Sequence, residues 1–238
     1  MTPDPRRPDP RLIVALDLPT IAQAQELVAK LDGLVTFYKI GLWLFFEPGV
    51  DTLIDSLIAR GNQVFLDYKM YDIGETVRRG VASAARRGVS LTTVHGDPDI
   101  LAAAAEGAAG TPLQVFAISV LTSTDNAGLR AMGYQQTVPE LITLRAQAAA
   151  AAAIHGLIAS AADNLAPLKQ LGLKIATPGI RLPTDPPGDQ KRTATPAQAI
   201  AAGADYLVIG RPITAHSNPA ARAELILADM NQTPPPQK

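Results

Sequence analysis

The stretch QVFLDYKMYD, residues 63–72, is an apolar run that ends in three ionisable side chains. Such a run is typical of a buried β-strand, and buried strands seldom end in so much charge. Side chains alternate faces along a strand, so Asp67 and Lys69 are expected on the same side, with Asp72 beyond the strand where the chain turns. Two interpretations remain open at this point: an ordinary ion pair at a strand end, or an acid and an ammonium gathered for chemistry.

Similar β-rich runs recur along the chain and alternate with amphipathic or alanine-rich stretches that are typical of helices. The expected strands are residues 12–16, 35–40, 64–68, 91–94, 113–118, 156–159, 174–177 and 206–209. The expected helices are residues 22–31, 50–60, 76–87, 98–108, 139–153, 164–171, 196–202 and 218–230. Eight such units predict an α/β fold in which parallel strands, joined by right-handed crossovers, close into a (β/α)8 TIM barrel.

The chain has 238 residues and is 47% hydrophobic, which is enough for one sizeable core. We expect a single barrel domain over residues 12–230, with a disordered arm at 1–11 and a disordered tail at 231–238, where prolines are closely spaced. The alternative is a doubly wound open sheet. Residues 17–20, after the first expected strand, lack the Gly-x-Gly-x-x-Gly turn of dinucleotide-binding sheets, which favours the barrel.

Charge and composition exclude several classes of function. The 21 Lys and Arg residues are balanced by 22 Asp and Glu, so the chain lacks the basic excess that drives binding to nucleic acids or anionic membranes. It has no cysteine and only three scattered histidines, which argues against disulfides and metal sites. No apolar run reaches the roughly 18 residues of a membrane span, and no signal-peptide pattern is present. We therefore expect a cytoplasmic protein without metal, nucleic acid or membrane as a partner.

Polar side chains occur where the expected strands end, which is the catalytic face of a TIM barrel. They are Asp17, Lys39, Asp67, Lys69, His95, Thr122, Ser123, Arg181 and Arg211. A salt bridge at the barrel rim would explain any one of them. Their repetition at the same edge of successive strands indicates an active site.

The segments after the last two strands are suited to phosphate, as is usual in this fold. Gly210 lets an anion approach backbone N–H groups, and the guanidinium of Arg211 can contact phosphate with two hydrogen bonds. Arg181 supplies a second guanidinium at the neighbouring strand end. The loop 181–191 adds the amide of Gln190 and has the length of a lid, although an ordinary surface loop is the alternative.

Seven short motifs, in order along the chain, resemble those of the orotidine 5'-phosphate decarboxylase family. They are VALD (14–17), YKIG (38–41), FLDYKMYDI (65–73), LTS (121–123), TPGIR (177–181), GDQ (188–190) and IGRP (209–212). The resemblance covers about residues 12–227. It implies a homodimeric enzyme that converts orotidine 5'-phosphate to UMP and carbon dioxide, in de novo pyrimidine synthesis, with no cofactor.

The resemblance also implies roles for residues of the second and third motifs and for one residue just after the third. Lys69 is similar to the lysine that protonates C6 of the pyrimidine as carbon dioxide leaves, and Asp67 to its carboxylate neighbour near the substrate carboxylate. Lys39 is similar to the lysine that orients the array and contacts the ribose. Asp72 matches the aspartate that the family donates across a dimer interface into the partner's site, and Thr76 matches a companion ribose contact.

Further substrate contacts follow from the same resemblance. They are Asp17 for the ribose hydroxyls, Thr122 and Ser123 for the pyrimidine edge, Arg181, Gln190, Gly210 and Arg211 for the phosphate, and Pro178. For His95, a structural hydrogen bond and a ligand contact both remain open. The family often has Pro-Asn-Thr where this chain has Gly74-Glu75-Thr76, so the reach of Thr76 is the point at which the chain departs from the pattern.

Two other functions remain open. A magnesium-dependent phospho-sugar enzyme of the same barrel group, such as a 3-keto-gulonate-phosphate decarboxylase or a hexulose-phosphate synthase, is similar at Asp67-x-Lys69-x-x-Asp72. Such an enzyme is not expected to carry the 121–123 motif together with the loop 181–190. A non-catalytic barrel that binds nucleotide phosphates would keep the pocket, but it would gain nothing from burying two lysines.

Overall fold

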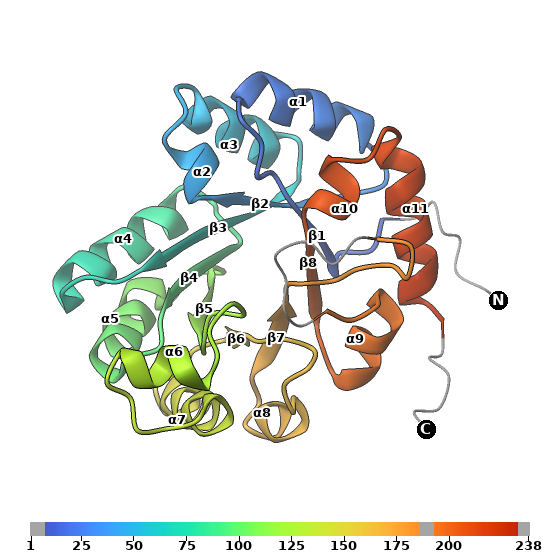
Figure 1. The fold of residues 1–238 in the computed structure, drawn as a ribbon. Helices are drawn as coiled ribbons and strands as arrows, with labels where there is room; N and C mark the ends of the chain where they lie inside the picture. Colours follow the sequence, from blue (N-terminus) through green and yellow to red (C-terminus); the bar gives the residue numbers. More distant parts are fainter. Residues whose placement is uncertain (1–7, 186–192, 233–238) are drawn as a thin grey trace.

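The computed structural model describes residues 8–185 and 193–232. Within these residues, eight parallel strands form a closed barrel in which each strand is hydrogen-bonded to its neighbours in chain order (Figure 1). The strands are β1 (Leu12–Ala15), β2 (Phe37–Gly41), β3 (Gln63–Met70), β4 (Leu91–His95), β5 (Gln114–Ile118), β6 (Gly156–Ile158), β7 (Lys174–Thr177) and β8 (Tyr206–Ile209). Pairing of β1 with β8 closes the ring. The predicted TIM barrel is confirmed, and the open sheet is excluded.

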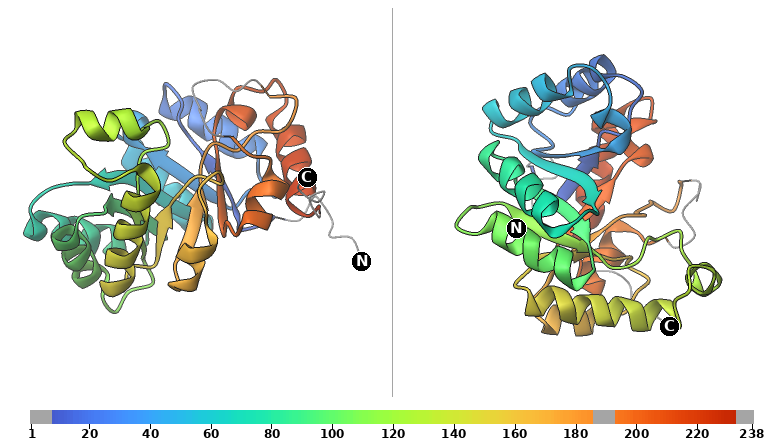
Figure 2. Two further views of the ribbon diagram at one scale, coloured as in Figure 1. Left: turned by 60° about the horizontal axis from the view of Figure 1, so that its bottom comes forward. Right: turned by 90° about the vertical axis from the view of Figure 1, so that its left-hand side faces the viewer.

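The helices lie around the outside of the barrel (Figures 1 and 2). Eight of those in the described residues match the predicted helices to within a few residues at each end. They are α1 (Ile21–Lys30), α3 (Val50–Ala59), α4 (Gly74–Arg86), α5 (Pro98–Ala108), α7 (Val138–Ala151), α8 (Ala166–Gln170), α9 (Pro196–Ala202) and α11 (Pro219–Met230).

Three short helices were not predicted. They are α2 (Leu42–Phe45), α6 (Asn126–Ala131) and α10 (Arg211–Thr214), and they follow β2, β5 and β8. Each has only four to six residues, which is too short for the helical period to emerge from the sequence. All three stand in loops at the C-terminal ends of strands, so they shape the face on which the site is built.

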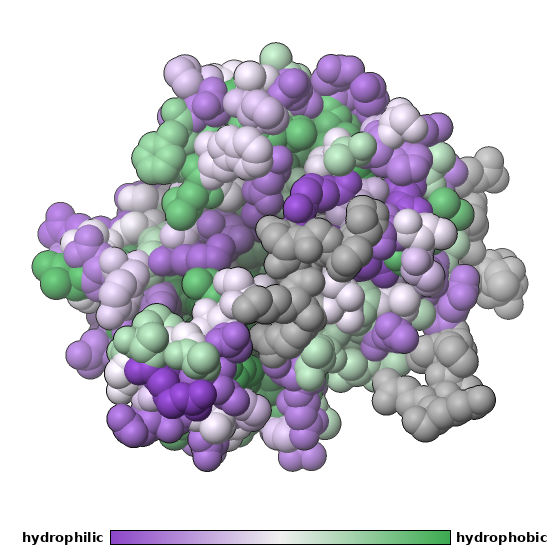
Figure 3. All heavy atoms as spheres, viewed as in Figure 1, coloured by the Kyte–Doolittle hydropathy of each residue, from purple (hydrophilic) through white to green (hydrophobic). Residues whose placement is uncertain are grey.

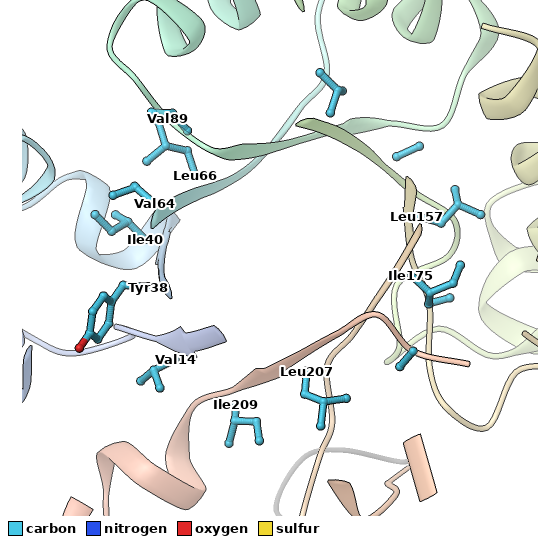
Figure 4. Packing of buried hydrophobic residues seen from close by; sticks show 14 of the residues in the cluster. Val14, Tyr38, Ile40, Val64, Leu66, Val89, Leu157, Ile175, Leu207 and Ile209 are labelled. Carbon is cyan, nitrogen blue, oxygen red and sulfur yellow. The ribbon is translucent and has the colours of Figure 1, made fainter. Parts of the chain in front are cut away.

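Apolar side chains fill both sides of the barrel wall. Figure 4 shows Val14, Leu66 and Leu207 on the outer side of the strands, where the helices cover them. Because successive residues of a strand point to opposite faces, their neighbours fill the interior of the barrel. That interior cluster consists of Ile13, Ala15, Phe37, Phe65, Leu91, Phe116, Ala176 and Val208.

Arg11 and Asn231, near the two ends of the described chain, contact the last strand and the last helix of the barrel. The carbonyl oxygen of Arg11 accepts a hydrogen bond from the N–H of Leu207 at 2.8 Å, and the side chain of Asn231 donates to the carbonyl of Leu227 at 2.9 Å. Residues 1–7 and 233–238 lie outside the described residues, so disorder of these ends stays a prediction. In the two described ranges, no helix combines the length and the apolar character needed to cross a bilayer.

Candidate active site

Charged side chains lie directly above the apolar interior of the barrel. Lys39 follows Phe37 by two residues and Asp67 follows Phe65 by two, so the period of the strand turns all four side chains inward. The side chains of Lys39 and Asp67 are only 9% and 14% exposed. Charges removed from water to this extent must be paired, because an isolated buried charge is strongly unfavourable.

The carboxylate of Asp67 pairs with both lysines. Its Oδ1 accepts a hydrogen bond from Lys69 Nζ at 2.8 Å, and its Oδ2 lies 3.4 Å from Lys39 Nζ. Lys39 Nζ also donates to Asp17 Oδ1 at 3.1 Å. The four groups therefore form an array that alternates in sign from Asp17 to Lys69. Asp67 and Lys69 meet as predicted, although β3 departs from a regular strand between Leu66 and Met70.

The surroundings keep Asp67 negative. Burial by itself raises the pKa of the Asp67 carboxyl, but the charges of Lys39 and Lys69 and the hydrogen bonds from Lys69 and Thr93 outweigh burial and hold the pKa below its usual range. Asp67 is therefore ionised at neutral pH.

Gly41 is placed where the array leaves no room for a side chain. A Cβ atom at this position would lie 2.9 Å from Asp17 Oδ1 and 2.9 Å from Lys39 Nζ. Real Cβ atoms do not approach other heavy atoms so closely. The glycine at the end of β2 thus allows Lys39 and Asp17 to meet against the backbone.

A cavity of about 510 Å³ opens above the array. Nine of the site residues predicted from the sequence line it: Asp17, Lys39, Asp67, Lys69, Thr122, Pro178, Arg181, Gly210 and Arg211. They lie near the C-terminal ends of β2 and β3 or in the loops after β1, β5, β7 and β8, so the cavity is at the C-terminal face of the barrel. In the closed ring, β7 and β8 lie across from β3 and β4, which places the two arginines opposite Lys69.

The two arginines make one side of the cavity strongly positive. Burial and the positive charge of Arg211 lower the pKa of Arg181, while Asp185 acts in the opposite direction. Two guanidiniums in one pocket repel each other, and an anion between them would remove that repulsion. This side of the cavity is therefore suited to a phosphate group.

The structure places three other predicted site residues away from this cavity, and a fourth lies outside the described residues. Ser123 is exposed and does not line the cavity. Asp72 and Thr76 are also exposed, and Asp72 Oδ1 accepts a hydrogen bond at 2.7 Å from the N–H of Ile73. Gln190 lies outside the described residues, as do residues 186–192 of the predicted lid.

His95 contacts other side chains at the end of β4. Its Nδ1 lies 3.6 Å from Asp97 Oδ2, and its ring packs on the ring of Tyr71 with centroids 4.4 Å apart. Burial and the charge of Arg145 lower the pKa of His95 despite the opposing effect of Asp97, so the imidazole is neutral at pH 7. His95 does not line the described part of the cavity. The buried Nδ1 makes no hydrogen bond within the described residues, so a structural hydrogen bond of His95 stays a prediction.

Several wall residues were missed by the sequence prediction. Phe65, Ile158 and Val208 line the cavity floor. The alternation of inward and outward side chains along each strand could have identified them. Trp43 also lines the cavity, but it belongs to α2, a helix that was not predicted from the sequence. Thr93, in the buried strand β4, hydrogen-bonds to Asp67 and had no signal of its own among the apolar neighbours.

A second cavity of about 520 Å³ lies between the loop after β5, the start of α7 and α8. It shares Thr122 with the first cavity, but no lysine or arginine is found among the described residues that line it. Nor do the described ranges contain a group of three or more His, Asp or Glu side chains arranged to hold a metal ion. The alternating array with its facing arginines is the better candidate for chemistry on a phosphorylated substrate.

Comparison with known proteins agrees with this geometry. A family model described as orotidine 5'-phosphate decarboxylase / HUMPS family matches residues 10–226. The chain belongs to this family.

Relatives within the family share nearly half of their residues with the chain. A protein of Afipia carboxidovorans named orotidine 5'-phosphate decarboxylase is 49% identical over 97% of this chain and 98% of its own length. A protein of Bradyrhizobium sp. with the same name is 48% identical over 94% of this chain and 92% of its own length.

Solved structures of similar fold include relatives from other bacteria. The crystal structure of orotidine 5'-phosphate decarboxylase from Lactobacillus acidophilus superposes with a TM-score of 0.81 at 32% identity, covering 94% of this chain and 100% of that one. A conserved protein from Geobacillus kaustophilus, described as uncharacterized, has a TM-score of 0.78 at 28% identity and covers 92% and 99%.

The low pKa of Asp67 predicts a pH dependence of folding. A carboxyl whose pKa is lower in the folded than in the unfolded state contributes stability above its unfolded pKa, about 3.9, and this contribution is lost as the pH falls through the folded value. Between about pH 5 and 3, the wild type should lose more free energy of unfolding than Asp67→Asn, as measured by urea unfolding. Asp32→Asn, at the exposed pair with Arg60, is the control and should follow the wild type. Parallel curves for Asp67→Asn and wild type would contradict the assignment.

Proposed function

We propose that this chain is an orotidine 5'-phosphate decarboxylase, which converts orotidine 5'-phosphate to UMP and carbon dioxide in pyrimidine nucleotide synthesis. The observation that carries the proposal is the alternating array of Asp17, Lys39, Asp67 and Lys69 in a cavity whose facing side holds two arginines. Relatives of that name at 48–49% identity support it. We also infer a cytoplasmic location, because the proposed substrate is a charged nucleotide.

The reaction requires stabilisation of a negative charge on carbon. When the bond between C6 and the carboxylate breaks, the electron pair stays on C6, and this pyrimidine ring offers no electron sink of the kind that pyridoxal phosphate provides. An ammonium about 4 Å from that carbon is worth roughly 4 kcal/mol at an effective dielectric constant near 20. In the proposal, Lys69 supplies this charge and then transfers a proton from Nζ to C6, which yields UMP.

The neighbouring charges keep that ammonium in place before the reaction starts. Asp67 holds Lys69 through one oxygen and faces Lys39 with the other, beside the position proposed for the substrate carboxylate. Lys39 in turn is fixed by Asp17. Because these groups are already oriented, little reorganisation accompanies the formation of the carbanion, and this preorganisation is the main source of rate acceleration.

The remaining contacts follow the direction of the cavity. We assign the phosphate to Arg181, Gly210 and Arg211, with Pro178 beside them and Gln190 as a further donor. The ribose is assigned to Asp17 and Lys39, with Thr76 of the partner subunit as a companion, and the pyrimidine edge to Thr122 and Ser123. Binding energy from the phosphate, far from C6, can then be used to align the reacting groups.

A homodimer would complete the site. Asp72 is exposed in the single chain, and its neighbours Tyr71 and Ile73 are 66% and 74% exposed. Phe46, after α2, is 77% exposed, and Figure 3 shows hydrophobic side chains gathered over α2. Apolar surface of this kind around an acidic residue is typical of a protein interface. We propose that a second copy covers it, and that Asp72 of the partner subunit joins the array beside Lys69 as a third carboxylate.

The alternatives differ in what they need. A magnesium-dependent phospho-sugar enzyme would lose activity without divalent metal, and a binding protein would release no carbon dioxide. The alternating array supports catalysis over binding alone. Burying the charge of Lys39 is unfavourable, and binding by itself gains nothing from it.

An ultraviolet assay of orotidine 5'-phosphate consumption in the presence of EDTA tests the function. The wild type is expected to turn over, and Lys69→Ala to lose turnover at least about a hundredfold because the proton donor and the charge at C6 are both removed. Binding of UMP to the variant, measured by calorimetry, should persist. A wild type that is inactive with EDTA, or a Lys69→Ala variant within tenfold of the wild type, would refute the assigned role.

Arg211→Ala tests the phosphate site. Loss of one guanidinium from the positive side of the cavity is expected to weaken UMP binding at least about tenfold in calorimetry, because charge-assisted hydrogen bonds to phosphate are among the strongest polar contacts. Arg60→Ala is the control and should leave the affinity unchanged, because Arg60 follows the last residue of α3 and forms an exposed ion pair with Asp32. Equal affinity of Arg211→Ala and wild type would place the phosphate elsewhere.

Mixed dimers test the donation of Asp72. Homodimers of Lys69→Ala and of Asp72→Asn are each expected to be nearly inactive. A mixed dimer would contain one site with wild-type Lys69 and wild-type Asp72, so an equilibrated equal mixture should recover about one quarter of wild-type activity. Recovery is expected only after subunit exchange. A mixture that stays inactive after proven exchange would show that Asp72 serves its own subunit.

A further inference from the structure

An irregularity in β3 presents both Asp67 and Lys69 to the cavity. β3 pairs with β4 in the register Leu66 with Thr92, and the next pair is Met70 with Val94. Three residues of β3, 67–69, therefore face a single residue of β4, Thr93. Such a bulge interrupts the ladder of hydrogen bonds and turns side chains in directions that a regular strand does not allow.

The backbone of the bulge is held in an unusual conformation. Lys69 has a φ of +47°, in the left-handed region that residues with a side chain rarely adopt. A conformation of this kind persists only where the surroundings enforce it, and it is common at functional sites. The structure around Lys69 must therefore contain contacts that favour this geometry over a regular strand.

Thr93 makes those contacts with one hydroxyl group. Its Oγ1 accepts a hydrogen bond from the backbone N–H of Lys69 at 3.0 Å and donates one to Asp67 Oδ1 at 3.0 Å. The side chain is fully buried. The same Asp67 oxygen receives Lys69 Nζ at 2.8 Å, so Thr93 fixes both the backbone of the lysine and the carboxylate that its ammonium contacts.

The neighbouring Thr92 satisfies the other side of the bulge. Its hydroxyl donates to the carbonyl oxygen of Leu66 at 3.0 Å, and it is as buried as Thr93. Because adjacent residues of a strand point to opposite faces, the side chain of Thr92 points away from that of Thr93. Neither Asp67 nor Lys69 is among the hydrogen-bond partners of Thr92. The two threonines thus have similar burial and one strand in common, but only one of them contacts the charged array.

We propose that Thr93 is a positioning residue for the decarboxylation, which orients Lys69 and Asp67 through its hydroxyl without touching the substrate. The inference rests on the proposed function and names a residue that its mechanism needs. A hydroxyl is required because the site demands a donor and an acceptor on one atom. Valine has the same shape and supplies neither, whereas serine supplies both.

Three variants test the proposal: Thr93→Val, Thr93→Ser and, as the matched control, Thr92→Val. Thr93→Val is expected to lower kcat at least about tenfold, since small misplacements of catalytic groups have effects of this size, while KM changes by less than about threefold. Thr93→Ser should restore kcat to within about threefold of the wild type. Thr92→Val should lower the melting temperature as Thr93→Val does and keep kcat within about threefold.

Structures of the variants separate this inference from the proposed function. In a crystal structure of Thr93→Val, Lys69 is expected to leave its positive φ and its Nζ to move out of hydrogen-bond range of Asp67. The role of Thr93 would be overturned if Thr93→Val kept that geometry or kept its kcat. An equal loss of kcat in Thr92→Val would overturn it as well. An inactive wild type would instead overturn the proposed function, and the crystallographic comparison would then decide on Thr93 alone.

Discussion

The carboxylate of Asp67 is the group on which the rest of the site depends. It stands above a barrel interior made of apolar side chains, where an unpaired charge is strongly disfavoured. One of its oxygens takes the ammonium of Lys69 and the other faces that of Lys39. Without this anion, two ammoniums would face each other with little water to separate them. The carboxylate that offsets the cost of burying these lysines also holds the ammonium of Lys69 in position for chemistry.

Closure of the barrel brings the other functional groups to this carboxylate. Asp17 and Arg211 come from opposite ends of the chain, yet they follow β1 and β8, which pair directly. Lys39 and Asp67 lie on the adjacent strands β2 and β3, where Lys39 pairs with Phe65 and Asp67 with Gly41. The alternation of side chains along each strand then decides which residues face the helices and which face the cavity. A shift of one residue in any of these strands would turn its charge into the apolar layer beneath the helices.

Much of this arrangement could be predicted because it depends on short-range patterns. The bounds of β7 and β8 agree with their prediction, and Asp17, Lys39, Asp67 and Arg211 meet at one cavity because strand ends in a parallel barrel share an edge. The bulge of β3 and the contacts of Thr93 were not predictable, since the pairing of two strands leaves no local mark in either one. Helix α2, which brings Trp43 to the cavity, is too short to show a period. The role of Asp72 rests on the proposed dimer, and an interface between two copies leaves no local pattern in the sequence of one.

The absence of a side chain at Gly41 limits how this pocket could be redesigned. A methyl group there would lie 2.9 Å from both Asp17 Oδ1 and Lys39 Nζ, so the end of at least one of these side chains would have to move. A substitution of Gly41 intended to change which substrates fit the cavity would therefore also displace Asp17 or Lys39. Trp43 and Leu121, which border the same cavity and are largely exposed, offer engineering positions that leave the ion pairs intact.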